Sequence, residues 1–118
     1  MSRIWLDYLQ DMLDAVIDIE SFVQGATCET FVKDNMRRNA VIRSLEIIGE
    51  AAKNIPEELR NQYHDIPWKR MAGMRDKLIH GYFGVDYESV WSLATERISD
   101  MKQPIEKMIR EQSNNKRK

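Results

Sequence analysis

The sequence is poor in the residues that build disulfide frameworks, cysteine-based zinc sites and irregular loops. Its 118 residues include one cysteine, three prolines and five glycines. A single cysteine excludes an internal disulfide and a cysteine-based zinc site, and it favours a reducing compartment. No hydrophobic run approaches the ~20 residues that a membrane-spanning helix needs, and the charged fraction is 31%. We therefore expect an ordered, helical and cytoplasmic protein.

An excess of positive charge is lacking as well. The 18 basic and 19 acidic side chains leave a formal net charge of −1. This balance argues against a protein that coats nucleic acid without sequence preference. The charges are nevertheless segregated, because residues 1–29 sum to −5 and residues 67–81 to +3. The basic residues of the second segment form either a solvated helix face or a track for nucleic acid.

Apolar residues recur every three or four positions along most of the chain, which is the period of an α-helix. A first helix is expected over residues 2–25, with Ser2 as its N-cap and Gly25 at its end. A second helical region is expected over residues 27–54, with a break near Asp34. Both helices have an apolar face wide enough to be buried in a core.

The second half of the chain carries its own helix signals. A short element is expected over residues 57–63, and Pro67 suits the first turn of a third long helix. Asp86 is expected to cap the last helix, which Pro104 should kink or split after Lys102.

These elements predict an all-α fold, an antiparallel up-and-down bundle of four main helices plus a short helix. The chain length suits one domain. We assign residues 1–111 to this domain and residues 112–118 to a polar tail that should be disordered.

The polar side of the second helical region has the spacing of salt bridges within a helix. Its residues are Arg43, Glu46, Glu50 and Lys53, and we interpret them as a solvated face. Gly49 lies among them and costs a helix ~1 kcal/mol relative to alanine. We therefore expect another backbone to approach closely at Gly49.

The third long helix contains the residues that a purely structural interpretation explains poorly. Arg75 interrupts its apolar stripe, and a guanidinium there needs a partner or a ligand. Its planar cation suits phosphate oxygens, and His80 suits proton transfer near neutral pH. Asp76 lies four residues before His80, so we expect its carboxylate to orient the imidazole.

Arg75 and His80 do not share one face of a helix. Five residues of α-helix turn about 500°, so the two positions lie about 140° apart. Two copies related by a twofold axis would bring two arginines and two histidines to one cleft. The spacing therefore predicts a homodimer.

With these residues the chain resembles the HEPN domains and, among them, the HepT-type toxins. The family motif is an arginine, four residues, a histidine, one residue and a tyrosine, which here are Arg75, His80 and Tyr82. Further matches are LEIIGEA at 45–51, IPW at 66–68, MAGM at 71–74 and HGYFGVD at 80–86.

The resemblance implies a metal-independent endoribonuclease that acts as the toxin of a toxin–antitoxin pair. The implied partner is a nucleotidyltransferase antitoxin of the MNT type, which would silence the toxin by transferring AMP from ATP to Tyr82. Arg75 and His80 would be catalytic, with Asp76 in support, and no cofactor is implied. The residues expected to guide the RNA backbone are Lys69, Arg70 and Lys77.

Two other functions remain open at this point. One is a non-catalytic helical module that binds a nucleotide or a nucleotidyltransferase partner. The other is a structural dimerisation domain in which Arg75 pairs with Asp76 across the interface. The intact motif favours the enzyme.

Overall fold

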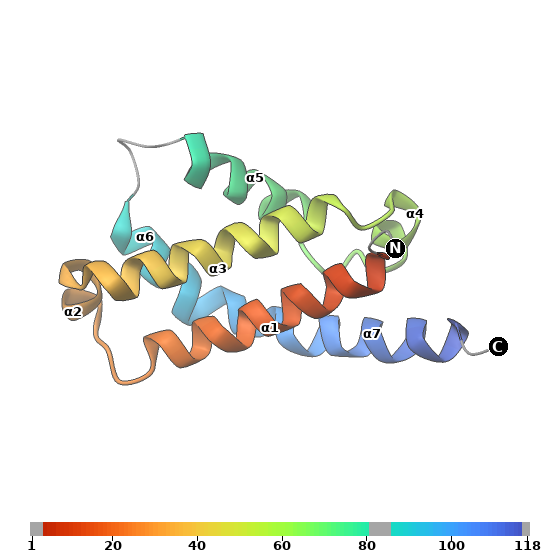
Figure 1. Cartoon of the computed structure of the whole chain (residues 1–118), viewed down its shortest axis with the longest axis horizontal. Helices are drawn as coiled ribbons and strands as arrows, with labels where there is room; N and C mark the ends of the chain where they lie inside the picture. Colours follow the sequence, from red (N-terminus) through yellow and green to blue (C-terminus); the bar gives the residue numbers. More distant parts are fainter. Residues whose placement is uncertain (1–3, 81–85, 117–118) are drawn as a thin grey trace.

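A computed structural model of the chain describes residues 4–80 and 86–116, and these ranges form a helical bundle without strands (Figure 1). The helices are α1 (Trp5–Val23), α2 (Cys28–Lys33), α3 (Asn35–Lys53), α4 (Glu57–Gln62), α5 (Trp68–His80), α6 (Tyr87–Ser92) and α7 (Lys102–Lys116). A π-helical segment, η1 (Leu93–Arg97), and a 3-10 segment, η2 (Ile98–Met101), join α6 to α7. The predicted all-α fold is confirmed.

The long helices α1, α3, α5 and α7 run alternately in opposite directions (Figure 1). Helix α3 packs against α1 on one side and against α5 on the other, and α7 packs against α1. The helix that carries Arg75 therefore rests on α3. No helix within the described ranges is long and apolar enough to span a bilayer.

The core lies between the apolar faces of α1, α3 and α7, with contributions from the shorter helices. Its fully buried side chains include Leu9, Met12, Val16, Ile19, Phe31, Val41, Leu45, Ile48, Ile105 and Met108. Trp68 is buried, and its Nε1 donates to the Tyr63 carbonyl at 3.0 Å. The ring of Trp91 lies 5.3 Å from that of Phe31, between centroids.

Local signals place several helix ends where the sequence predicted them. The break near Asp34 is confirmed, because α2 ends at Lys33 and the Asp34 side chain accepts from the Arg37 N–H at the start of α3. Gly25 has a φ of +78°, the left-handed conformation expected after α1. Asp86 caps α6 by accepting from two backbone N–H groups. Ser2 lies outside the described residues.

The break in the last helical region differs from the prediction. The irregular segment spans residues 93–101, before Pro104 and not after Lys102. Pro104 lies in the first turn of α7, where the absence of its N–H removes no bond within the helix. The segment is held by packing, since both η1 and η2 contact α1.

Helix α7 extends into residues 112–118, for which the sequence predicts a polar tail. Helix α7 continues to Lys116. The Gln112 amide donates to the Tyr63 hydroxyl at 3.0 Å, and that hydroxyl donates to Glu111 at 2.8 Å. Burial, together with the nearby Glu111 carboxylate, raises the pKa of Tyr63. These contacts join α7, at Glu111 and Gln112, to the segment after α4.

At Gly49, α5 approaches α3 closely, as the sequence predicted. A Cβ atom at this position would overlap the Cβ of Arg75 and would lie 2.7 Å from the Met71 carbonyl oxygen. Only a residue without a side chain allows the two helices to pack at this distance.

Gly49→Ala should therefore lower the free energy of unfolding by about 1–3 kcal/mol, the usual cost of overpacking. Gly73→Ala in α5 is the matched control, because a Cβ atom added there would meet nothing within 4 Å, and it should stabilise the helix by up to ~1 kcal/mol. Urea unfolding of the two variants measures both effects. Equal effects of the same sign would contradict the close packing at Gly49.

Candidate active site

Arg75 lies in the middle of α5, directly over Gly49 of α3, with its side chain 27% exposed. Its Nε lies 3.1 Å from Oε2 of Glu50, and its Nη1 donates to Oδ1 of Asp76 at 3.3 Å. The partner that the sequence required for this guanidinium is thus present within the chain, from α3 as well as from α5.

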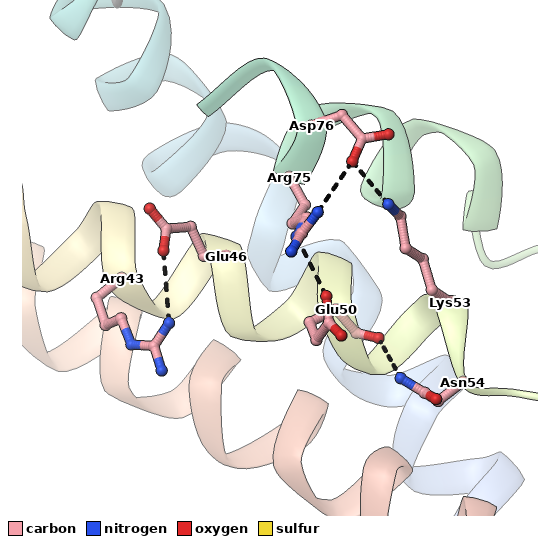
Figure 2. Close-up of polar contacts among 7 residues, drawn as sticks. All are labelled: Arg43, Glu46, Glu50, Lys53, Asn54, Arg75 and Asp76. Carbon is pink, nitrogen blue, oxygen red and sulfur yellow. Dashed lines mark hydrogen bonds and ion pairs between the residues drawn. The ribbon is translucent and has the colours of Figure 1, made fainter. Parts of the chain in front are cut away.

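Four charged side chains form one alternating cluster at the α3–α5 contact (Figure 2). Glu50 and Lys53 come from successive turns of α3, while Arg75 and Asp76 are neighbours on α5. Lys53 Nζ donates to Oδ1 of Asp76 at 2.6 Å, so the order of charges is Glu50, Arg75, Asp76, Lys53. The formal charges cancel, and each cation lies beside a carboxylate.

The surroundings of Asp76 favour its ionised form. Hydrogen bonds from Lys53 and then from Arg75 lower the pKa of this carboxyl below its ordinary value. Both contacts use the same oxygen, Oδ1. The imidazole of His80 lies outside the described side chains, so the expected contact from Asp76 to His80 stays a prediction.

The interpretation of the polar side of α3 as a solvated face is only half right. Arg43 does pair with Glu46 along the helix, at 3.4 Å. Glu50 and Lys53 instead reach across to α5, and sequence reasoning missed this role. Gly49 was the available signal, since residues beside a close approach of two helices are well placed to bridge them.

Of the two motif residues after Arg75, the structure describes only the backbone of His80. Helix α5 continues through His80, so it does not end near Ile79, and positions 75 and 80 keep their angular separation on the helix. Tyr82 lies outside the described residues. One described chain therefore does not bring the arginine and histidine positions onto one face.

The predicted RNA-guiding residues Lys69, Arg70 and Lys77 are all exposed. Lys69 and Arg70 line a hollow of about 380 Å³ at the start of α5, whereas Lys77 lies two turns further along. Arg60 and His64 line the same hollow, together with Glu57. The sequence did not point to these two residues as RNA-guiding, because they come from the short segment that precedes α5.

A second hollow, between α1 and α3, has the opposite charge. It has a volume of about 390 Å³, and its lining includes Asp11, Asp14, Asp18 and Glu50 with Arg43 as the basic residue. Among residues 4–80 and 86–116, no group of three or more His, Cys, Asp or Glu side chains is arranged to hold a metal ion.

Comparison with known proteins gives one consistent result. The family described as ribonuclease HepT-like matches residues 12–108. The chain is 47% identical over 108 residues to "Probable ribonuclease HepT" of Thermococcus cleftensis, covering 92% of this chain and 98% of that protein. It is 45% identical over 104 residues to "Putative RNase MJ0127" of Methanocaldococcus jannaschii, covering 88% and 86%. No solved structure matches.

The charged cluster predicts a dependence of stability on pH. Because the pKa of Asp76 is lowered by folding, its ionised form stabilises the folded state above the ordinary value of 3.8. This contribution is lost as the pH falls through the lower pKa of the folded state. The difference in the free energy of unfolding between the parent and Asp76→Asn, the stability gap, should therefore be largest near neutral pH. It should vanish in acid.

Urea unfolding between about pH 2 and pH 7 measures this gap. Asp100→Asn, which removes another exposed carboxylate, reports the effect of a lost surface charge alone. A gap for Asp76→Asn that is independent of pH would contradict the assigned ion pairs.

Proposed function

Because the chain belongs to the ribonuclease HepT-like family, we propose that it is an endoribonuclease and the toxin of a toxin–antitoxin pair. The observation that carries the proposal is the family match over residues 12–108, in a chain that has Arg75, His80 and Tyr82 at the motif positions. RNA is the substrate, and the ribose 2′-hydroxyl is the nucleophile.

The chemistry requires a base for the 2′-hydroxyl, an acid for the departing 5′-oxygen and a cation at the phosphate. His80 would supply the proton transfers, and general acid–base catalysis contributes typically ~10²–10⁴-fold. Arg75 would bind the phosphate and stabilise the charge that develops on it. These steps use side chains alone and need no metal ion.

The angular separation of the motif residues favours a composite site in a homodimer. Positions 75 and 80 lie about 140° apart on an α-helix. A twofold axis beside α5 would allow two arginines and two histidines to act on one phosphate, with one histidine as base and the other as acid.

The distribution of charge indicates where RNA approaches. Phosphates are attracted to the hollow at the start of α5, where Arg60, Lys69 and Arg70 meet, and onward to Lys77. On the α1 side of the hollow between α1 and α3, the carboxylates of Asp11, Asp14 and Asp18 would repel the phosphates. We therefore propose that RNA runs along α5 toward the motif.

Silencing by a nucleotidyltransferase antitoxin of the MNT type fits the same site. Transfer of AMP from ATP to the Tyr82 hydroxyl would form a phosphodiester and release pyrophosphate. The attached group adds bulk and negative charge two residues from His80, where an RNA phosphate must bind.

One observation favours a second candidate, a non-catalytic module that binds a nucleotide or a nucleotidyltransferase. The guanidinium of Arg75 is already paired with Glu50 and Asp76 at 3.1 and 3.3 Å, as in a structural ion-pair network. Such an arginine need not contact substrate. The assay of cleavage separates the two candidates.

The parent protein, expressed without its partner, should cleave labelled RNA in the presence of EDTA and leave 2′,3′-cyclic phosphate ends. His80→Ala should lower the rate by at least ~10²-fold, and a DNA strand of the same sequence should stay intact because it lacks the 2′-hydroxyl. Equal cleavage by parent and variant would point to a contaminating nuclease. No cleavage by either, with Tyr82 unmodified in the intact mass, would favour the binding module.

Incubation with the nucleotidyltransferase and ATP should increase the mass of the toxin by AMP and abolish cleavage. Tyr82→Phe should remain unmodified, because it lacks the hydroxyl that accepts AMP. Tyr87→Phe is the matched control, since Tyr87 lies at the start of α6 beneath the guanidinium of Arg38, and it should be modified like the parent. AMP on Tyr82→Phe would contradict the assigned acceptor.

A further inference from the structure

We propose that Glu50 is a positioning residue for Arg75. Lys53 offsets the negative charge that would otherwise repel a phosphate from the site. Neither residue belongs to the motif of Arg75, His80 and Tyr82, although Glu50 lies in the matching stretch 45–51, and both come from α3, about 25 residues earlier in the chain. The proposal rests on the ribonuclease function proposed above and adds the residues that prepare its arginine.

The contact with Glu50 is placed where it controls the orientation of the guanidinium. Oε2 of Glu50 lies 3.1 Å from Nε, the nitrogen nearest the aliphatic stem of Arg75, while Asp76 engages Nη1. A guanidinium has five N–H donors in one plane. Two carboxylates on two of its nitrogens fix that plane, and the donors of Nη2 remain for a phosphate oxygen.

The backbone makes this contact possible. Gly49 lets α3 approach the Cβ of Arg75 and the Met71 carbonyl. The residue that follows, Glu50, then lies at the edge of the helix contact, with its side chain 56% exposed. Glu50 is thus close enough to bind Arg75 and open enough for RNA to reach the pair.

Lys53 has a different task, which follows from the charge balance. Glu50 and Asp76 together outweigh the single positive charge of Arg75. Lys53, at 2.6 Å from Asp76, brings the cluster to neutrality. Without Lys53, a phosphate would approach a cluster of net charge −1, which weakens its binding through electrostatic repulsion.

The two roles predict effects on different kinetic constants. Glu50→Ala frees the guanidinium and removes a negative charge, so kcat should fall about tenfold, as expected for a lost hydrogen bond to a charged group, while KM stays unchanged or falls. Glu50→Gln keeps an oxygen that accepts from Nε, and should retain kcat within about threefold. Lys53→Ala should raise KM and leave kcat nearly unchanged.

Glu46→Ala is the matched control, because Glu46 forms a similar surface ion pair on α3, with Arg43 at 3.4 Å and not with α5. It should behave like the parent in both constants. A merely structural role for Glu50 would lower thermal stability without this split between kcat and KM, and without rescue by glutamine. That result would overturn the proposal.

A second measurement tests the contact without relying on activity. In the full-length protein with ¹⁵N-labelled arginine, the Nε–H signal of Arg75, assigned by its loss in Arg75→Lys, should be protected from exchange in the parent and in Glu50→Gln. The protection should be lost in Glu50→Ala. An unchanged signal in Glu50→Ala overturns the positioning role, whether or not the protein cleaves RNA. Failure of the parent to cleave RNA instead overturns the ribonuclease function, and the Arg75 signal still decides what Glu50 does.

Discussion

The close contact of α3 with α5 at Gly49 is the constraint on which the candidate site depends. The absence of a side chain at this position lets the two helices pack with the Cβ of Arg75 over the α3 backbone. That packing brings Glu50 and Lys53 within reach of Arg75 and Asp76. Exposed and half-exposed ion pairs contribute only about 0–1 kcal/mol each. Packing therefore places the charges, and the charges do not create the packing.

Much of the fold was predictable because its signals are local. The apolar stripes, the capping carboxylates of Asp34 and Asp86 and the left-handed Gly25 each act within a few residues of their position. The irregular segment 93–101 and the last turns of α7 were not predictable in the same way. The first contacts α1, and the second is joined at Gln112 to Tyr63, nearly 50 residues away. A local sequence pattern does not predict which distant residue a segment contacts.

The candidate site was likewise predictable only where its signals are local. The misfit of Arg75 on an apolar stripe was enough to predict that it has a partner, and the motif was enough to suggest its chemistry. The sequence did not identify Glu50 as this partner. The reason is that pairing along one helix explains the spacing equally well for Arg43, Glu46, Glu50 and Lys53. Arg43 and Glu46 do pair in this way. Only the neighbouring glycine distinguishes the residues that cross to another helix from those that do not.

A paired arginine is compatible with catalysis, although the pairing first suggests a structural role. An unpaired guanidinium would rotate freely, and binding a phosphate would then require the loss of that freedom. A guanidinium fixed by two carboxylates has already lost it during folding, so its remaining donors need little reorganisation when the phosphate arrives. The two carboxylates also reduce the attraction for RNA, which is the cost of this arrangement. Lys53 offsets that cost, and a structural and a catalytic role can therefore reside in the same ion pairs.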